Sequence, residues 1–283
     1  MQIKFNDVSF KYNENSEFEV NVLSQINLSL NSDKIIAIAG QTGSGKSTLS
    51  ELINRLLVPT EGEVIIDHLI NSKAIKVKRK ELFNYRKNIG FLFQFSENQL
   101  FEDSVIKDVM FGIKNFYPKE NNIEQMAKDA LKLVGLNESF YYRSPFELSG
   151  GEKKRVAIAG VIAYKPKLLI LDEPTIGLDE KGKYEIMNLF KKIHESGVGL
   201  IIVTHDMDIV SKYADEIIIL DNHNVAKIGK VKDVFKEDIE QYHLKTPNLN
   251  HFVNSLKVKG LNLNEDKIID IPSLIKEIKE VHG

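Results

Sequence analysis

The residues with the clearest chemistry form one glycine-rich run, Gly40-Gln41-Thr42-Gly43-Ser44-Gly45-Lys46-Ser47-Thr48. Its glycines let the backbone curl so that successive N–H groups face one anion. An apolar run precedes the loop and a helical pattern follows it, so the positive end of a helix adds to the anion site. In this G-x-x-x-x-G-K-[ST] pattern, Lys46 supplies a cation for the β- and γ-phosphates and Ser47 a hydroxyl ligand for Mg²⁺. The run predicts a nucleoside triphosphate site, against the alternative of an ordinary glycine-rich turn.

Other polar side chains end further apolar runs of the sequence. Asp172 and Glu173 follow residues 168–171, Gln94 closes residues 89–93, and His205 follows residues 200–203. The carboxyl ends of parallel strands meet at one edge of a sheet, where ligands bind, so we expect these groups to converge on the phosphate loop. Each taken alone also fits a structural role, such as a solvated loop start or a structural histidine.

The chemistry of these groups suggests a role for each. A buried carboxylate requires a cation nearby, so Asp172 suits Mg²⁺, reached through a water. Glu173 is suited to orient or deprotonate the attacking water. Gln94 suits Mg²⁺ or that water, and His205 suits a γ-phosphate oxygen as charge builds in the transition state. Tyr12, expected just beyond the first strand, is a candidate for stacking on the base, with Phe18 as a competitor and an ordinary surface or core tyrosine as the alternative.

Apolar patterning predicts the elements that position these groups. Five apolar runs predict buried strands, and helical patterns lie between them. The runs are residues 35–39, 89–93, 168–171, 200–203 and 217–220. This order predicts an α/β fold with a mostly parallel sheet covered by helices on both faces. Residues 2–10, 26–30 and 63–67 alternate in polarity, which indicates a small antiparallel sheet near the N-terminus.

The tail from about residue 232 to 283 changes in composition. It is rich in Lys and Asn, contains Pro247 and Pro272, and carries short apolar clusters such as Phe252, Val253 and Leu256. We interpret it as a small C-terminal subdomain. Its apolar residues fit either a docking surface within the chain or a contact between two chains.

Composition excludes several classes of protein. The chain has 283 residues, of which 42% are hydrophobic and 28% charged, which are globular proportions. The absence of Cys excludes disulfides, thiolate metal sites and a catalytic thiol. A net charge of -2 lacks the excess positive charge of a nucleic-acid binder, and no nucleic-acid partner is expected. No apolar run approaches the ~18 residues that span a bilayer, so a membrane role would require a partner.

Residues Leu148-Ser149-Gly150-Gly151-Glu152, followed by KKRVAIAG, carry a further pattern. The turn fits a capping box between Ser149 and Glu152 and also a second anion site at a helix start. The segment resembles the ABC signature, and residues 1–231 resemble the ATPase subunit of an ABC transporter. The resemblance implies a P-loop NTPase fold of the ABC ATPase type with a helical subdomain at about residues 95–165.

The resemblance also implies roles for individual residues. Tyr12 takes the adenine-stacking position, Gly40 to Thr48 the Walker A segment, Gln94 the Q-loop glutamine, and Asp172 the Walker B acid. Glu173 takes the place of the catalytic glutamate, Gly177-Leu178-Asp179 that of the D-loop, and His205 that of the switch histidine. The signature residues Ser149, Gly150, Gly151 and Glu152 of one subunit complete the ATP site of its partner in a head-to-tail dimer. Glu152 stands where Gln is common, and Ile176-Gly177 stand where small residues such as Ser-Ala are common.

A narrower resemblance covers nearly the whole chain. Four segments are similar to energy-coupling-factor transporter ATPases of the cobalt type, and most like the second of two paralogues. They are FLFQFSENQLFEDSVIKDVMFG, YRSPFELSGGEKKRVAIAGVIA, the spacer after Tyr12 that contains Phe18, and HFVNSLKVKGL. This implies an ATP-hydrolysing subunit, peripheral on the cytoplasmic side of the cell membrane, that powers uptake of vitamins or transition-metal ions. Its implied partners are a second ATPase in a heterodimer, a shared transmembrane subunit and exchangeable substrate-binding membrane subunits.

Three alternatives compete with this interpretation. An ABC importer ATPase for another substrate would share all the general motifs. A chromosome- or repair-type ABC ATPase would carry a long coiled coil, whereas only about a hundred residues without sustained heptads separate loop and signature here. A small-molecule kinase with the same phosphate loop would not need the signature.

Overall fold

The computed structural model describes residues 1–264, 267–268 and 271–282, so part of the predicted tail subdomain (265–266, 269–270 and 283) lies outside the described residues. In chain order the strands are β1 (Gln2–Tyr12), β2 (Val20–Asn31), β3 (Ile35–Gly40), β4 (Glu61–Ile66), β5 (Leu69–Asn71), β6 (Ile89–Leu92), β7 (Leu168–Asp172), β8 (Gly199–Val203), β9 (Glu216–Asp221) and β10 (Asn224–Lys230). The helices are α1 (Lys46–Ile53), α2 (Arg79–Lys87), α3 (Val105–Phe116), α4 (Ile123–Leu133), α5 (Gly150–Ile162), α6 (Glu180–Glu195), α7 (Met207–Tyr213), α8 (Val231–Val234), α9 (Asn248–Val258) and α10 (Ile271–His282).

The predicted mostly parallel sheet is confirmed. Its strand order is β10-β9-β3-β8-β7-β6, and every neighbouring pair except β10 with β9 is parallel. The five apolar runs of the sequence became its parallel strands, because a strand covered on both faces is apolar on both faces. In β7, Leu168 and Ile170 pack into one cluster, whereas Leu169 and Leu171 pack into another.

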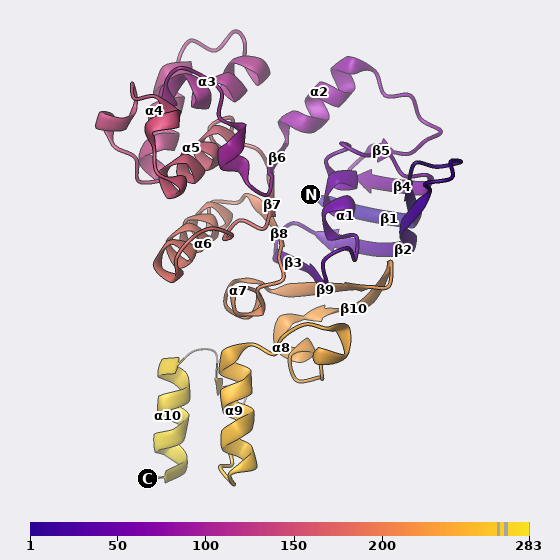
Figure 1. Cartoon of the computed structure of the whole chain (residues 1–283), viewed down its shortest axis with the longest axis vertical. Coiled ribbons are helices and arrows are strands. Elements are labelled where there is room, and N and C mark those ends of the chain that lie inside the picture. Colours follow the sequence, from indigo (N-terminus) through magenta and orange to yellow (C-terminus); the bar gives the residue numbers. More distant parts are fainter. Residues whose placement is uncertain (265–266, 269–270, 283) are drawn as a thin grey trace.

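The predicted small antiparallel sheet is also confirmed, with strand order β2-β1-β4-β5. Alternation in β1 buries Ile3 and Phe5 and leaves Lys4 exposed. The buried face of this sheet packs with α1 against one face of the parallel sheet. Tyr85 of α2 also enters this cluster, so that face is covered by α1, part of α2 and the small sheet (Figure 1).

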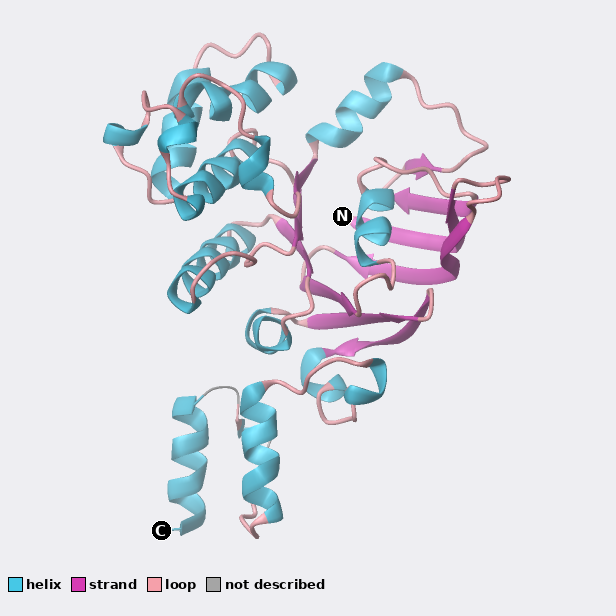
Figure 2. Cartoon of the chain, in the orientation of Figure 1, coloured by secondary structure: helices cyan, strands magenta, loops and turns pink. Residues whose placement is uncertain are grey.

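The opposite face of the parallel sheet is helical. Residues of α3, α4, α5 and α6 form one continuous core cluster with β6, β7 and β8. Figure 2 shows these helices gathered on the far side of the sheet from α1 and the small sheet. The faces of α3 and α4 that enter this cluster follow the helical spacing of apolar residues.

The tail divides into two parts. Residues of α8 together with Phe235, Ile239 and Leu244 pack on β9 and α7, so they belong with the domain built on the parallel sheet. Residues of α9 and α10 contribute Val253 and Leu274 to a separate small cluster. Among the described residues, no helix combines the length and the apolar character needed to cross a membrane.

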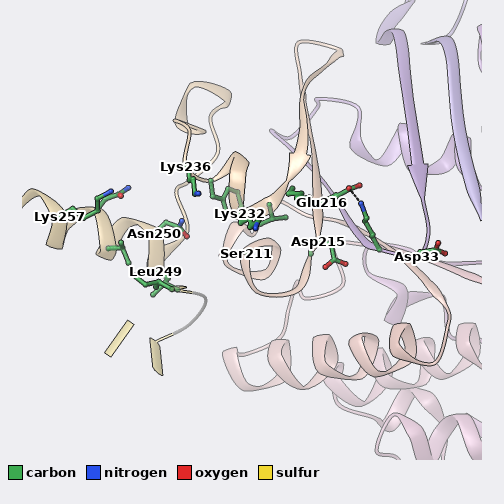
Figure 3. A pocket seen from close by; sticks show the side chains of 17 residues that line it. Asp33, Ser211, Asp215, Glu216, Lys232, Lys236, Leu249, Asn250 and Lys257 are labelled. Carbon is green, nitrogen blue, oxygen red and sulfur yellow. Dashed lines mark hydrogen bonds and ion pairs between the residues drawn. The ribbon is translucent and has the colours of Figure 1, made fainter. Parts of the chain in front are cut away.

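A cavity of about 730 Å³ separates the edge of the parallel sheet from α9. Figure 3 shows Asp215, Glu216 and Lys232 on the cassette side and Leu249 and Asn250 on the α9 side. Its lining contains none of the residues of the phosphate loop, so this cavity is distinct from the predicted nucleotide site.

Candidate functional site

The phosphate loop connects the end of β3 to the start of α1, as predicted. Gly43 has φ +85° and Gly45 has φ +96°, a region that favours glycine. A Cβ atom on Gly45 would lie 2.9 Å from the Val22 carbonyl oxygen, whereas one on Gly43 would meet nothing within 4 Å. The loop is therefore tightly packed beneath Gly45 and open at Gly43, which leaves room for an anion.

Lys46 lies over this loop. Its Nζ donates hydrogen bonds to the carbonyl oxygens of Gly40, at 2.8 Å, and Gln41, at 2.7 Å. Burial lowers the pKa of Lys46, while the carboxylates of Glu173 and Asp172 act in the opposite direction. Ser44 contributes a buried hydroxyl that has no hydrogen-bond partner among the described residues. A cation and an orphan hydroxyl in one curled loop fit the phosphates of a nucleotide.

Asp172 ends β7 beside the first turn of α1. Burial raises the pKa of the Asp172 carboxyl, the hydrogen bond from the Ser47 side chain opposes this shift, and Glu173 raises the pKa further. The described residues hold no group of three His, Cys, Asp or Glu side chains suited to a metal. A hydroxyl and one carboxylate nevertheless fit Mg²⁺, which typically takes one or two protein oxygens together with phosphate oxygens and water.

Glu173 and His205 are brought into direct contact. The parallel pairing of β7 and β8 sets Asp172 opposite Val203, which aligns the residues that follow each strand. Glu173 Oε1 accepts hydrogen bonds from the His205 backbone N–H at 3.2 Å and lies 2.6 Å from His205 Nδ1. Glu173 Oε2 accepts a hydrogen bond from the Thr204 hydroxyl at 3.1 Å. The carboxylate is thus almost fully buried and fixed in orientation at the mouth of the loop.

Gln94 follows β6, and β6 pairs with β7 in parallel register. The residue therefore lies at the same sheet edge as Asp172, as predicted, and it is exposed. Tyr12 is the last residue of β1, not a residue beyond it. Its hydroxyl lies 3.3 Å from Thr48 Oγ1, so its half-exposed ring stands beside the start of α1. Phe18, the competing aromatic residue, is 77% exposed.

The signature turn forms the capping box that the sequence predicted. Ser149 Oγ accepts a hydrogen bond from the Glu152 backbone N–H at 3.4 Å, and the Glu152 carboxylate accepts one from the Ser149 N–H at 2.8 Å. The hydrogen bonds from Ser149 lower the pKa of Glu152. Asp179, in the predicted D-loop, caps α6 by accepting a hydrogen bond from the Gly182 N–H at 2.7 Å.

The structure does not bring this turn to the phosphate loop of the same chain. The helix it opens, α5, packs on the face of the parallel sheet opposite to α1, and Figure 1 shows the two helices on different sides of β6, β7 and β8. Gly150 and Gly151 belong to the helix itself, and a Cβ on Gly150 would meet nothing within 4 Å. The chain's own backbone therefore does not require glycine at Gly150.

Comparison with known proteins agrees with this geometry. A family model described as ABC transporter matches residues 23–176. The chain belongs to the ABC transporter family. Across its full length it is 43% identical to the energy-coupling factor transporter ATP-binding protein EcfA2 of Streptococcus agalactiae, with 100% of both chains covered. It is 42% identical to EcfA2 of Streptococcus pneumoniae, with 99% of both chains covered.

Solved structures place this ABC protein in the same group. One similar structure is cbiO1 from Clostridium perfringens, part of the ABC transporter complex cbiONQ. It has a TM-score of 0.73 and 38% identity, and covers 89% of this chain and 98% of that chain. Another is a dimeric ATP-binding cassette in a post-hydrolysis state bound to ADP and Pi. It has a TM-score of 0.73 and 32% identity, and covers 81% of this chain and 98% of that chain. The predicted fold and ATPase activity are thereby confirmed: the protein is an ATP-binding, ATP-hydrolysing subunit of an energy-coupling factor transporter.

Two residues of this ABC site were missed by the sequence analysis. Thr204 is fully buried and holds the Glu173 carboxylate, and its position directly before His205 in the run that ends β8 was the available signal. Lys154 is buried in α5, on the same helical face as Ile158 and Ile162. A lysine at i, i+4, i+8 spacing with two buried isoleucines is the pattern that indicates burial.

Proposed function

We propose that the buried Glu173 carboxylate is the general base for ATP hydrolysis in this chain, at a site built by Gly40 to Thr48. The observation that supports this most strongly is the hydrogen-bonded group of Glu173, Thr204 and His205 at the end of β7 and β8. A carboxylate held from both oxygens is positioned to take the proton of one attacking water. Its neighbour Asp172 is separately placed beside Ser47.

The other residues of the site bind the nucleotide and Mg²⁺. The backbone N–H groups of the loop and Lys46 bind the phosphates, and Tyr12 stacks on the adenine. Ser47, Asp172 and Gln94 are the residues that would hold Mg²⁺, which when bound neutralises charge between the β- and γ-phosphates. His205 orients Glu173 and, when it turns from that carboxylate, donates a hydrogen bond to a γ-phosphate oxygen.

The second half of each site comes from another chain. Ser149, Gly150, Gly151 and Glu152 face away from their own loop, so we propose that they contact ATP bound to a partner, with Asp179 at the same interface. The dimeric ADP- and Pi-bound relative supports a head-to-tail pair. The EcfA2 relatives favour a heterodimer with a second, related ATPase.

Transport requires membrane partners. Phe95, directly after Gln94, is exposed, and so are Phe101 and Phe111, whose rings stack edge to face with centroids 4.9 Å apart. We propose that residues 95–112 dock a shared transmembrane subunit, which itself receives exchangeable subunits for vitamins or transition-metal ions. The chain would then work as a peripheral protein on the cytoplasmic side of the cell membrane, and the cbiONQ relative supports such a complex. Residues 232–283 are proposed as a subdomain that contributes a dimer contact.

The experiment that tests this assignment is purification of the tagged protein from its own membranes, with identification of the proteins that accompany it. We expect a second ATPase and two kinds of small membrane protein. Recovery with a separate soluble binding protein and two large permeases would instead support another ABC importer class.

A further inference from the structure

Lys154 is a buried cation in the helix that the signature turn opens. Only 3% of its surface is exposed, and its Nζ donates a hydrogen bond of 2.7 Å to the carbonyl oxygen of Ile176. Burial lowers the pKa of Lys154, and the carboxylates of Glu97 and Glu173 counteract this shift. A buried ammonium is costly unless acceptors and opposite charges compensate it, so these contacts decide where the side chain lies.

The acceptor of this hydrogen bond belongs to the turn that follows Glu173. The backbone N–H of Ile176 donates to the carbonyl oxygen of Glu173 at 3.3 Å, and Glu173 has φ +47°, a backbone conformation uncommon for a residue with a side chain. Lys154 is therefore hydrogen-bonded to the carbonyl of Ile176, and the N–H of Ile176 is in turn hydrogen-bonded to the backbone of Glu173. The same turn continues to Asp179 at the start of α6.

A carboxylate on a different segment acts on Lys154 electrostatically. The 3₁₀ turn at Ser96–Gln99, which begins two residues after Gln94, packs against α5 and carries Glu97. The Oε2 atom of Glu97 is buried and has no hydrogen-bond partner among the described residues. An ammonium group has three protons to donate. Lys154 is thus hydrogen-bonded to the carbonyl oxygen of Ile176 and attracted by the charge of Glu97, which lies three residues after Gln94.

We propose that Lys154 is a positioning residue that transmits movement of the signature helix to Glu173 of the same chain. The signature turn faces ATP on the partner, whereas Glu173 faces ATP on its own chain, so Lys154 joins the two sites of a dimer through one side chain. This proposal rests on the roles proposed above for Glu173 and the signature. It adds a link between them that passes through the hydrogen bond to the Ile176 carbonyl, while the Glu97 carboxylate stabilises the charge of Lys154 electrostatically.

The test compares Lys154→Met with Lys153→Met in the assembled transporter. Both variants lose one positive charge from α5, but Lys153 is half-exposed. Methionine is similar in length and apolar, so burying it should not unfold the chain. For Lys154→Met we expect turnover to fall about tenfold or more, the size of loss typical for a hydrogen bond to a charged group, with nucleotide affinity within about twofold of the original. Lys153→Met should keep its turnover.

Two further variants make the proposal specific. Lys154→Gln keeps an N–H donor for Ile176 without the charge, so it should lose less turnover than Lys154→Met. Glu97→Gln combined with Lys154→Met should lose less than the product of the two single losses, because residues that act through each other are not additive.

Several results would overturn the inference. The first is an equal loss of turnover in Lys154→Met and Lys153→Met. The second is a loss of nucleotide affinity, or a fall in the thermal midpoint, that parallels the loss of turnover. The third is additivity of the turnover losses caused by Glu97→Gln and Lys154→Met. Failure of the proposed function is separately visible, because Glu173→Gln would then still hydrolyse ATP at the normal rate. Loss of hydrolysis in Glu173→Gln with normal turnover in Lys154→Met would remove only the link.

Discussion

The phosphate loop and the signature turn are built from similar residues but differ in how they pack against the rest of the chain. Both are glycine-containing turns that open a helix, and both offer backbone N–H groups to an anion. At the loop, Gly45 is packed against Val22 and Leu23, and Ser44 and Thr48 are buried. At the signature, Ser149 and Gly150 are exposed and the polar groups satisfy one another.

This difference separates a glycine that the fold requires from one that it does not. Gly45 needs its positive φ to complete the loop, so the fold itself explains it. Gly150 has the backbone of an ordinary helix residue and open space around it, and glycine in a helix costs up to about 1 kcal/mol relative to alanine. The open space beside Gly150 leaves room for the proposed approach of a nucleotide bound to a partner subunit.

The largest expected effect concerns Glu173, at the part of the site that this chain supplies itself. Glu173→Gln keeps the hydrogen-bonding shape but removes the base, so turnover should fall by roughly 10²- to 10⁴-fold, the range for general-base catalysis. Nucleotide affinity should stay unchanged, because Glu173 is not part of the phosphate loop. Measurement of ATP turnover and of nucleotide binding on the same preparation checks both statements. A variant that turns over normally would remove Glu173 from its role.

A smaller effect is expected at the signature turn, which we propose to contact ATP bound to a partner subunit. Gly150→Ala adds a methyl group where the partner's phosphate would approach, so turnover of the assembled dimer should fall about a hundredfold, comparable to the loss of one donor to a developing anion. The thermal midpoint should stay equal or rise, because alanine favours the helix. The matched control is Gly160→Ala, in the same helix and also with nothing within 4 Å of an added Cβ. Equal turnover in the two alanine variants would contradict a composite site.

The smallest of these effects concerns the support of the base. Thr204→Val keeps the shape of the side chain and removes the hydroxyl that holds Glu173 Oε2. We expect turnover to fall about tenfold, since a hydrogen bond to a charged group contributes about 1.5–3 kcal/mol. Steady-state kinetics should show the change in kcat and little change in KM for ATP. An effect confined to KM would assign Thr204 to nucleotide binding instead.

The central strands and the phosphate loop could be predicted because their signals are local. A strand buried on both faces reads as an unbroken apolar run, as in Ile35–Gly40, and the loop is specified by consecutive residues. The convergence of Gln94, Asp172 and His205 followed from a general rule on parallel sheets. The covering of one sheet face by a second sheet did not follow, because strand alternation indicates a buried face but not the surface it packs on.

The contacts that link distant segments could not be predicted. Glu173 meets Thr204 and His205 only after β7 and β8 pair, and Lys154 meets Ile176 only after α5 packs beside that turn. The sequence marks such residues at most as polar side chains in apolar surroundings. The proposed partner of the signature turn is a different chain, so neither the sequence nor the fold of this chain contains it.

The most direct test of the account is the dependence of ATP turnover on association. Turnover per chain should be measured with Mg²⁺ and ATP over a range of concentrations, alone and with the second ATPase, while sedimentation follows the assembly state. We predict that turnover rises together with the dimer fraction and vanishes in the monomer. Full turnover by a chain that sediments as a monomer throughout would contradict a site divided between two subunits.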